Sequence, residues 1–198
     1  MQTQVHLVRH GETAWSLSGQ HTGSTDIGLT AHGQAQARGL APLLSPLPFT
    51  HVLSSPRLRA RQTCELAGLG QPLVIEPDLV EWDYGQYEGR RTADIWLDRP
   101  GWNVWRDGCP GGETPVQVSA RADRLVAHLC RLQGPIALFS HGQFGAALAM
   151  RWIGLPILAG QHFALHPASL SVLGHDSKRP GRRLIEHWNQ TRSSCDRA

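Results

Sequence analysis

The 198-residue chain lacks several features that would place it in a specialised class of protein. It has no run of about 18 uncharged apolar residues, which a membrane-spanning helix needs, and no signal peptide is visible at its start. It also lacks internal repeats, low-complexity linkers and long tracts of Lys or Arg, and its formal net charge is +3. We therefore expect one globular domain that binds neither membranes nor nucleic acid.

Cysteine pairs and cofactor motifs are also missing. The four cysteines form no CxxC or CxxH motif and are expected to be free thiols of a cytoplasmic protein, at Cys64, Cys109, Cys130 and Cys195. No Walker loop or GxGxxG fingerprint occurs, and no cofactor is expected. His162 and His166 have the spacing of a metal-binding pair, but a proline follows them in a predicted strand, so we expect no metal site.

Apolar runs alternate with helical patterns along most of the chain. Strands are predicted at Val5–Val8, His51–Ser55, Pro72–Pro77 and Pro135–Ser140, and short, partly antiparallel strands at His162–Leu165, Ser169–Leu173 and Leu184–His187. Helices are predicted at 30–44, 56–69, 115–132 and 142–153, with capping residues at Thr30, Ser55 and Thr114. This order predicts an α/β fold with a mostly parallel sheet and helices on both faces.

Two parts of the chain do not follow this alternation. Residues 80–112 show no regular pattern and are rich in tryptophan. Residues 189–198 are polar, and we expect them to form a disordered C-terminal tail after a single domain at 1–188.

Basic residues follow three of the predicted strands. Arg9 and His10 follow the first strand, Arg59 lies in the helix after the second, and His141 follows the strand at 135–140. Ligands of parallel α/β sheets bind at the carboxyl ends of the strands, where helix N-termini converge. One histidine alone would be an ordinary structural residue, but two histidines and two arginines at one sheet edge predict a pocket for an oxyanion.

The helix after the second strand has three arginines in its first two turns. The positive end of the helix dipole disfavours cations there, which indicates an anionic ligand nearby. The face expected to point at the core carries Ala60, Thr63, Cys64 and Ala67. Arg59 lies beside that face and is the expected pocket residue, whereas Arg57 and Arg61 are expected on the solvated face.

These groups are suited to phosphoryl transfer. A neutral His10 can attack phosphorus in line, while Arg9 and Arg59 spread over the equatorial oxygens, so no metal is needed. His141, if cationic, adds a further donor. The leaving alkoxide needs an acid, and Glu81 is a candidate because its apolar neighbours predict partial burial, which favours a protonated carboxyl. Asp83 stays an alternative.

Several stretches together resemble the histidine phosphatase superfamily, the phosphoglycerate mutase-like proteins: LVRHGET, SSPRLRARQT, LVEWDYGQYEG, GGET and LFSHGQFGAAL. The resemblance covers nearly the whole chain and implies a three-layer α/β/α sandwich. It implies His10 as the phosphorylated nucleophile and Glu81, rather than Asp83, as the proton donor. Arg9, Arg59 and His141 would complete the phosphate pocket.

The resemblance also implies substrate contacts at Ser16, Thr22, Gly23, Tyr84 and Gly142. Many members have Asn where this chain has Ser16. The stretch WSLSGQHTGSTDIGLT is closest to the sedoheptulose bisphosphatase-like sugar phosphatases, and the segment between the acid and the second histidine is shorter than in glycolytic mutases. We therefore expect a metal-independent phosphatase of small phosphorylated metabolites, such as sugar phosphates or bisphosphates, which could form a homo-oligomer.

Alternatives stay open at this point. A bisphosphoglycerate-dependent phosphoglycerate mutase would use the same residues, and a non-catalytic phosphate-binding module would share the fold. The tryptophans that follow Glu81 could line the leaving-group pocket or pack a loop-rich cap, at Trp82, Trp96, Trp102 and Trp105. Arg90 and Arg91 could bind a second phosphate or form an exposed pair.

Overall fold

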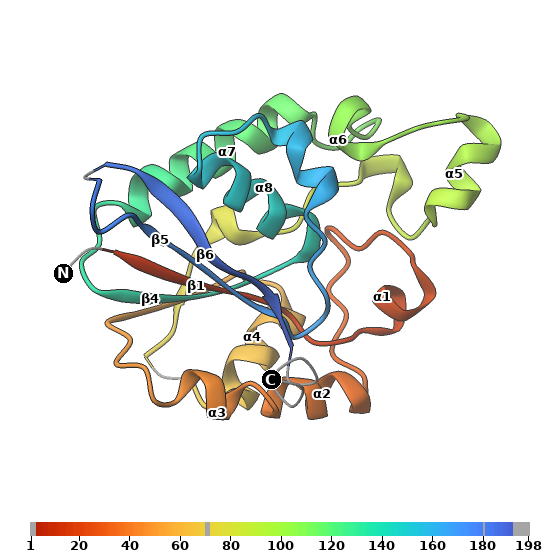
Figure 1. Ribbon diagram of the computed structural model, residues 1–198. Coiled ribbons are helices and arrows are strands. Elements are labelled where there is room, and N and C mark those ends of the chain that lie inside the picture. Colours follow the sequence, from red (N-terminus) through yellow and green to blue (C-terminus); the bar gives the residue numbers. More distant parts are fainter. Residues whose placement is uncertain (1–2, 70–71, 180, 192–198) are drawn as a thin grey trace.

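The computed structural model describes residues 3–69, 72–179 and 181–191, and its centre is one six-stranded sheet (Figure 1). The strand order is β3-β2-β4-β1-β5-β6. Four strands run parallel, namely β1 (Gln4–Arg9), β2 (His51–Ser54), β3 (Val74–Ile75) and β4 (Pro135–Ser140). The sheet continues antiparallel with β5 (Leu170–His175) and β6 (Arg183–Gln190).

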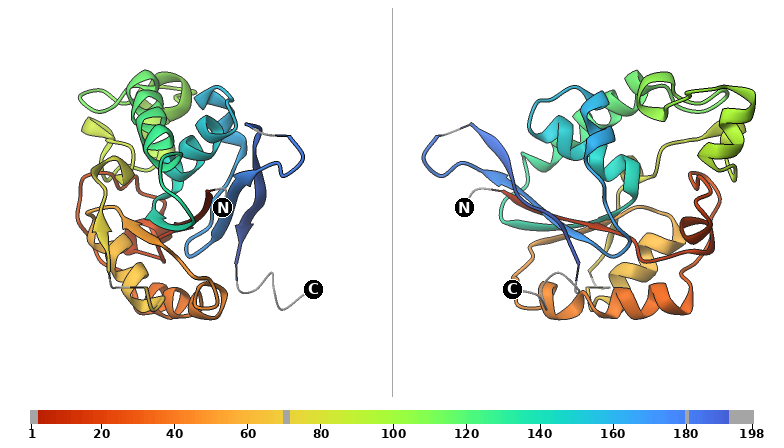
Figure 2. Two further views of the ribbon diagram at one scale, coloured as in Figure 1. Left: turned by 90° about the vertical axis from the view of Figure 1, so that its left-hand side faces the viewer. Right: turned by 45° about the vertical axis from the view of Figure 1, so that its right-hand side comes forward.

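Helices cover both faces of this sheet (Figures 1 and 2). On one face lie α2 (Ala31–Arg38), α3 (Ala41–Leu44) and α4 (Leu58–Leu66), and on the other α7 (Pro115–Leu129) and α8 (Gly142–Trp152). The predicted three-layer α/β/α sandwich is therefore confirmed.

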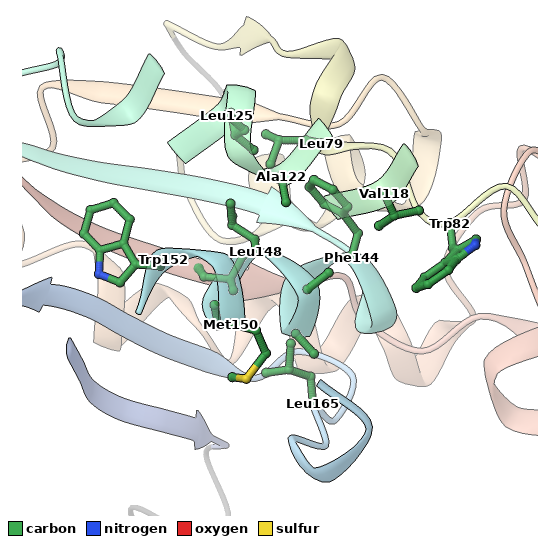
Figure 3. Packing of buried hydrophobic residues seen from close by; sticks show 14 of the residues in the cluster. Leu79, Trp82, Val118, Ala122, Leu125, Phe144, Leu148, Met150, Trp152 and Leu165 are labelled. Carbon is green, nitrogen blue, oxygen red and sulfur yellow. The ribbon is translucent and has the colours of Figure 1, made fainter. Parts of the chain in front are cut away.

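The central strands are apolar throughout because they are buried on both faces. In β1, Leu7 belongs to the core under α7 and α8, and Val8 belongs to the core under α3 and α4. In β4, Leu138 and Phe139 divide in the same way. Figure 3 shows the larger core, in which α7, α8 and the sheet enclose leucine, phenylalanine and tryptophan side chains.

Local chemistry starts the helices close to the predicted places. Thr30 accepts a hydrogen bond from the Gly33 N–H, and Thr114 and Gln117 form the predicted capping box. The helix after β2 begins at Leu58 rather than Pro56, because Arg57 is still extended, with ψ at 136°. It ends at Leu66, short of the predicted end.

Two other predicted elements are wrong. The helix predicted at 30–44 is divided into α2 and α3, because Gly39 weakens it and Pro42 has no N–H to continue the hydrogen-bond ladder. The strand predicted at His162–Leu165 is absent, and a 3₁₀ turn, η3 (Ile157–His162), precedes irregular chain. Side chains take up carbonyls that a strand would have paired, since Trp188 donates to the Ala164 oxygen and Arg9 to that of Leu165.

The tryptophan-rich segment at 80–112 is more ordered than its sequence predicts. It contains η2 (Gly85–Tyr87), α5 (Thr92–Asp98) and α6 (Val104–Asp107), and it follows η1 (Pro77–Leu79). Trp82, Trp102 and Trp105 are buried, which supports the packing alternative, while Trp96 is half exposed. Figure 1 shows α5 of this segment near α1 (Ala14–Ser18) at one end of the molecule.

The remaining expectations concern the termini, the cysteines and membrane spans. Strand β6 runs to Gln190, so the predicted tail begins later than residue 189, and residues 192–198 with Cys195 lie outside the described residues. Cys64, Cys109 and Cys130 are free thiols. No helix within the described ranges is long and apolar enough to span a membrane.

Candidate active site

The carboxyl ends of β1, β2 and β4 bring the predicted residues together. Strand β4 lies between β1 and β2, so His10, Ser55 and His141 follow three adjacent strand ends. The rings of His10 and His141 lie 5.2 Å apart, edge to face. Gly11 is required beside them because a Cβ there would lie 2.5 Å from the Gly33 carbonyl oxygen, at the start of α2.

His10 is hydrogen-bonded at one ring nitrogen, and its other ring nitrogen has no partner among the described residues. Its Nδ1 lies 2.7 Å from the Gly11 carbonyl oxygen and must therefore carry the proton, which leaves a lone pair on Nε2. Its main chain is bonded on both sides, because its N–H donates to the Ser140 oxygen and its carbonyl accepts from the Ala168 N–H. Burial, followed by the charges of Arg9 and Arg59, lowers its pKa well below 6.5. His10 is therefore neutral near pH 7.

His141 uses both of its ring nitrogens. Nδ1 accepts a hydrogen bond from Arg59 Nε at 3.2 Å, so Nε2 carries the proton and donates to Ser55 Oγ at 2.8 Å. Burial first, then the charge of Arg59, lowers its pKa well below 6.5. The cationic form considered from the sequence is thus disfavoured, and the ring acts as a neutral donor.

The two expected arginines both lie close enough to His10 for their charges to act on its ring. Arg59 is fully buried, and its guanidinium donates to the carbonyls of Thr22, Gly23 and Thr25. Arg9 donates to the Leu165 carbonyl, and Gly142 packs so closely that a Cβ there would lie 3.3 Å from Arg9 Cζ. The Arg9 Nε is buried without a hydrogen-bond partner among the residues described. Burial lowers the pKa of both guanidinium groups, and the charge of Glu81 opposes this shift.

The sequence predicts that the helix buries Arg59 and exposes Arg57 and Arg61. The structure agrees for Arg59 and Arg61 but not for Arg57. Arg61 is exposed, whereas Arg57 is half-buried and its charge contributes to lowering the pKa of His141. Arg57 precedes the first residue of α4, so the i, i+4 stripe drawn for a helix does not apply to it.

Glu81 and Asp83 occupy different environments. Glu81 is 6% exposed, and its Oε1 accepts from the backbone N–H groups of Trp82 and Phe144 at 2.9 and 2.8 Å. Its Oε2 accepts from the Gln143 N–H at 3.1 Å, so the carboxyl lies against the first turn of α8. Asp83 is exposed and accepts from the Gly85 N–H in a turn outside the cavity.

A cavity of about 250 Å³ opens on these groups. Six predicted residues line it, namely Arg9, His10, Ser16, Thr22, Glu81 and Tyr84. The other four do not line it: Arg59 and His141 are fully buried, Gly23 accepts from Arg59, and Gly142 packs on Arg9. Within the described ranges, no three His, Cys, Asp or Glu residues cluster closely enough to hold a metal ion.

A family model confirms what this geometry indicates. The model of the histidine phosphatase superfamily (branch 1) matches residues 5–191. The chain belongs to this superfamily. It is a phosphoric monoester hydrolase of the histidine phosphatase type, as the sequence predicts.

Similar proteins support the assignment of this histidine phosphatase. An acid phosphatase of Mycobacterium tuberculosis is 45% identical over 86% of this chain and 85% of its own. A sedoheptulose 1,7-bisphosphatase of Saccharomyces cerevisiae is 39% identical over 76% and 68%. The solved structure of an open reading frame from Mycobacterium tuberculosis is 40% identical, has a TM-score of 0.90, and covers 97% of this chain and 100% of that chain.

The histidine phosphatase site also contains residues that the sequence reasoning missed. Gly19, Gln20, His21, Thr92 and Gln143 line the cavity, and Ser55 bonds to His141. Ser55 and Gln143 had a usable signal, because Ser55 ends one predicted strand and Gln143 lies three residues after the end of another.

The cavity residues from the α1 loop and α5 had no local signal. His21 stacks on Tyr84, with ring centroids 4.5 Å apart, and its Nε2 lies 3.2 Å from Thr92 Oγ1. Burial lowers the pKa of His21 to about 4, so this ring is neutral near pH 7. Arg90 and Arg91 form ion pairs with Asp98 and Asp94 and do not line the cavity.

Proposed function

We propose that this histidine phosphatase hydrolyses phosphomonoesters of small metabolites through a phosphohistidine at His10 Nε2, without a metal ion. The position of that nitrogen carries the proposal. The Gly11 carbonyl holds the proton on Nδ1, and burial beside two guanidinium groups keeps the ring neutral. A neutral nucleophile next to fixed positive charge is what attack on an anionic phosphoryl group needs.

In the first step Nε2 forms a bond to phosphorus while the bond to the leaving oxygen breaks. Arg9, Arg59 and the Nε2–H of His141 stabilise the charge on the phosphoryl oxygens, after Arg59 and His141 exchange present partners for the substrate. The leaving oxygen takes a proton from Glu81. In the second step a water molecule gives a proton to Glu81 while the oxygen of that water bonds to phosphorus. The P–N bond breaks, and its electron pair returns to His10 Nε2.

The proton on Glu81 is best held at Oε2. Oε1 already accepts two backbone hydrogen bonds, which use both of its lone pairs in the carboxyl plane, whereas Oε2 accepts only one. Glu81 and His10 line the same cavity, so the acid and the nucleophile face one bound phosphate.

The cavity favours a small, hydroxylated substrate. Its volume of about 250 Å³ lies below the common range for drug-sized ligands. The leaving group would contact Ser16, Thr22 and Tyr84. Two glycines would act indirectly, because they let the arginine side chains pack closely against the main chain, Arg59 at Gly23 and Arg9 at Gly142. Similarity to a sedoheptulose 1,7-bisphosphatase supports sugar phosphates or bisphosphates as substrates. Cytoplasmic location and homo-oligomeric assembly stay predictions from the sequence.

Trapping the intermediate tests this function. Enzyme mixed with ³²P-labelled sugar phosphates and quenched in alkali should carry phosphate that is released by acid. His10→Ala should carry none and should not turn over. His6→Gln is a matched control, because His6 is also buried on β1 but lies outside the cavity, and it should keep the label. Normal hydrolysis by His10→Ala would refute the proposal.

The same label separates a phosphatase from a mutase. In a phosphatase, the label passes to water at the turnover rate, and added 2,3-bisphosphoglycerate does not increase that rate. Transfer of the label from His10 to phosphoglycerate, with stimulation by bisphosphoglycerate, would instead support the mutase alternative.

A further inference from the structure

We propose that Arg121 is a positioning residue for Glu81 and that Glu113, from the GGET stretch, completes the same support. Together the two residues bind the main chain on both sides of Glu81. Arg121 also packs on the ring of Phe144, whose N–H donates to the Glu81 carboxyl group. This inference rests on the proposed function, in which Glu81 protonates the leaving group.

Arg121 lies on α7 and is only 6% exposed, and every N–H of its guanidinium donates a hydrogen bond. Nη1 donates to the carbonyls of Asp78 and Val80, each at 2.8 Å, and Nη2 donates to the Glu81 carbonyl at 3.3 Å. Nε and Nη2 donate to the two carboxylate oxygens of Glu113 at 2.9 and 2.7 Å. These five hydrogen bonds match the five donors of a guanidinium.

Glu113 binds the residues that follow Glu81. Its Oε2 accepts from the Asp83 N–H and its main-chain carbonyl accepts from Trp82 Nε1, both at 2.9 Å. Its own N–H donates to the Asp83 carbonyl at 2.9 Å. Arg121 therefore holds the chain up to Glu81, and Glu113 holds the chain from Trp82 onward.

Arg121 also contacts the residue that binds the Glu81 carboxyl group. Its Cζ lies 4.0 Å from the centre of the Phe144 ring, and the Phe144 N–H donates to Glu81 Oε1. The guanidinium thus lies against both the backbone of the acid and the first turn of α8. A displacement of Arg121 changes where Oε2 points, and a misplacement of about 1 Å can cost about 10²-fold in rate.

Lysine cannot replace this arginine. An ammonium group has three donors and no planar fork, so Arg121→Lys keeps the charge but leaves at least two acceptors without their partner. Glu113→Gln replaces one carboxylate oxygen by an amide NH2, which faces an Arg121 donor in either orientation of the amide. The neighbouring Arg124 is a matched control, because it also pairs with residue 78, but through the Asp78 side chain and with 62% of its own side chain exposed.

The test compares two substrates of similar shape, p-nitrophenyl phosphate and benzyl phosphate. Nitrophenolate leaves largely unassisted, whereas the benzyl alkoxide needs an acid. A general acid contributes about 10²- to 10⁴-fold, so Glu81→Gln should lose this much on benzyl phosphate and far less on p-nitrophenyl phosphate. We expect Arg121→Lys and Glu113→Gln to lose about 10- to 100-fold in kcat on benzyl phosphate and less than about threefold on p-nitrophenyl phosphate.

Two comparisons separate positioning from a general loss of structure. Arg124→Lys should behave as wild type on both substrates, and Leu125→Ala, which removes a core side chain from the same helix, should affect both substrates equally. In the Glu81→Gln background, Arg121→Lys should cause no further loss specific to benzyl phosphate, because the residue it positions is gone.

Each possible failure has its own reading. If Glu81→Gln loses equally on both substrates, Glu81 is not the acid, and both the proposed function of that residue and this inference are overturned. If Glu81→Gln shows the leaving-group dependence but Arg121→Lys and Glu113→Gln lose equally on both substrates, only the positioning role is overturned. The positioning role would also be overturned if Arg121→Lys and Glu81→Gln together gave a loss on benzyl phosphate equal to the sum of their separate losses in free energy.

Discussion

The strands β1 and β4 are neighbours in the sheet, and a buried histidine follows each, but the two rings are held differently. His10 donates from Nδ1 to the Gly11 carbonyl, and within the described part of the chain its Nε2 has no hydrogen-bond partner. His141 is bonded at both nitrogens, to Arg59 and to Ser55. Burial lowers the pKa of both histidines, so protonation state does not distinguish them.

Hydrogen bonding is therefore what assigns the roles. A ring with one unused lone pair can form a bond to phosphorus, whereas a ring bonded at both ends can only donate, accept or orient its neighbours. In the proposed mechanism, equivalent positions at two strand ends thus provide a nucleophile and a supporting donor. This difference can be tested by changing each group in turn.

The largest expected effects come from changing the two histidines, and His10→Ala should cost more than His141→Asn. His141→Asn should lower kcat by about 10²-fold, the usual cost of one lost oxyanion donor, but His10 should still become labelled. His10→Ala should abolish both turnover and label. Loss of the label in a folded His141→Asn protein would show that the two rings do not have separate roles.

The next effect concerns pH. Because the pKa of His10 is lowered, its neutral form persists below pH 6.5, and activity falls only when the pH drops through the lower, folded-state value. Arg59→Met removes one of the two positive charges that lower the pKa of His10. The acid limb of kcat/KM should then move to higher pH, besides a loss in rate. Dividing the variant profile by that of wild type cancels ionisation of the substrate, and an unchanged limb would contradict the assigned cause.

A smaller effect is expected at the outer partner of His141. Ser55→Ala removes the acceptor of the His141 Nε2–H and should lower the free energy of unfolding by about 1 kcal/mol, with a few-fold loss of kcat. Ser54→Ala is the matched control, because the Ser54 hydroxyl is also buried but donates to the Ser55 carbonyl instead of contacting a histidine. Urea denaturation and initial rates measure the two effects, and equal rate losses for both variants would contradict a role through His141.

No effect at all is expected from chelation. Arg9 and Arg59 supply the positive charge beside His10, so activity should be unchanged after prolonged incubation with EDTA and dialysis. Loss of activity that a single divalent ion restores would show that the charge on these two arginines is insufficient.

Much of this site could be predicted because the signals were local. The order of apolar strands and helices defines the sheet edge, and Arg9, His10 and His141 follow directly from the strand ends. The helical face that selects Arg59 is also readable from one segment. The resemblance was needed to choose Glu81 over Asp83, since only the folded chain shows which carboxyl meets the N-terminus of α8.

What could not be predicted depends on contacts between distant segments. His21 and Thr92 meet across the cavity only because the loop after α1 lies against the start of α5. The strand predicted at 162–165 failed because Trp188 and Arg9 bond to its carbonyls. Side-chain competition of this kind leaves no periodic pattern in the sequence.

The main-chain bonds of His10 determine how the enzyme should lose activity. Its N–H and carbonyl are tied to Ser140 and Ala168, so the reactive residue cannot move without opening the centre of the sheet. Its amide should therefore exchange with deuterium at the rate of global unfolding, whereas amides in the exposed part of α5 exchange through local opening. In rising denaturant, turnover would hold nearly constant and then vanish together with the circular-dichroism signal of the sheet.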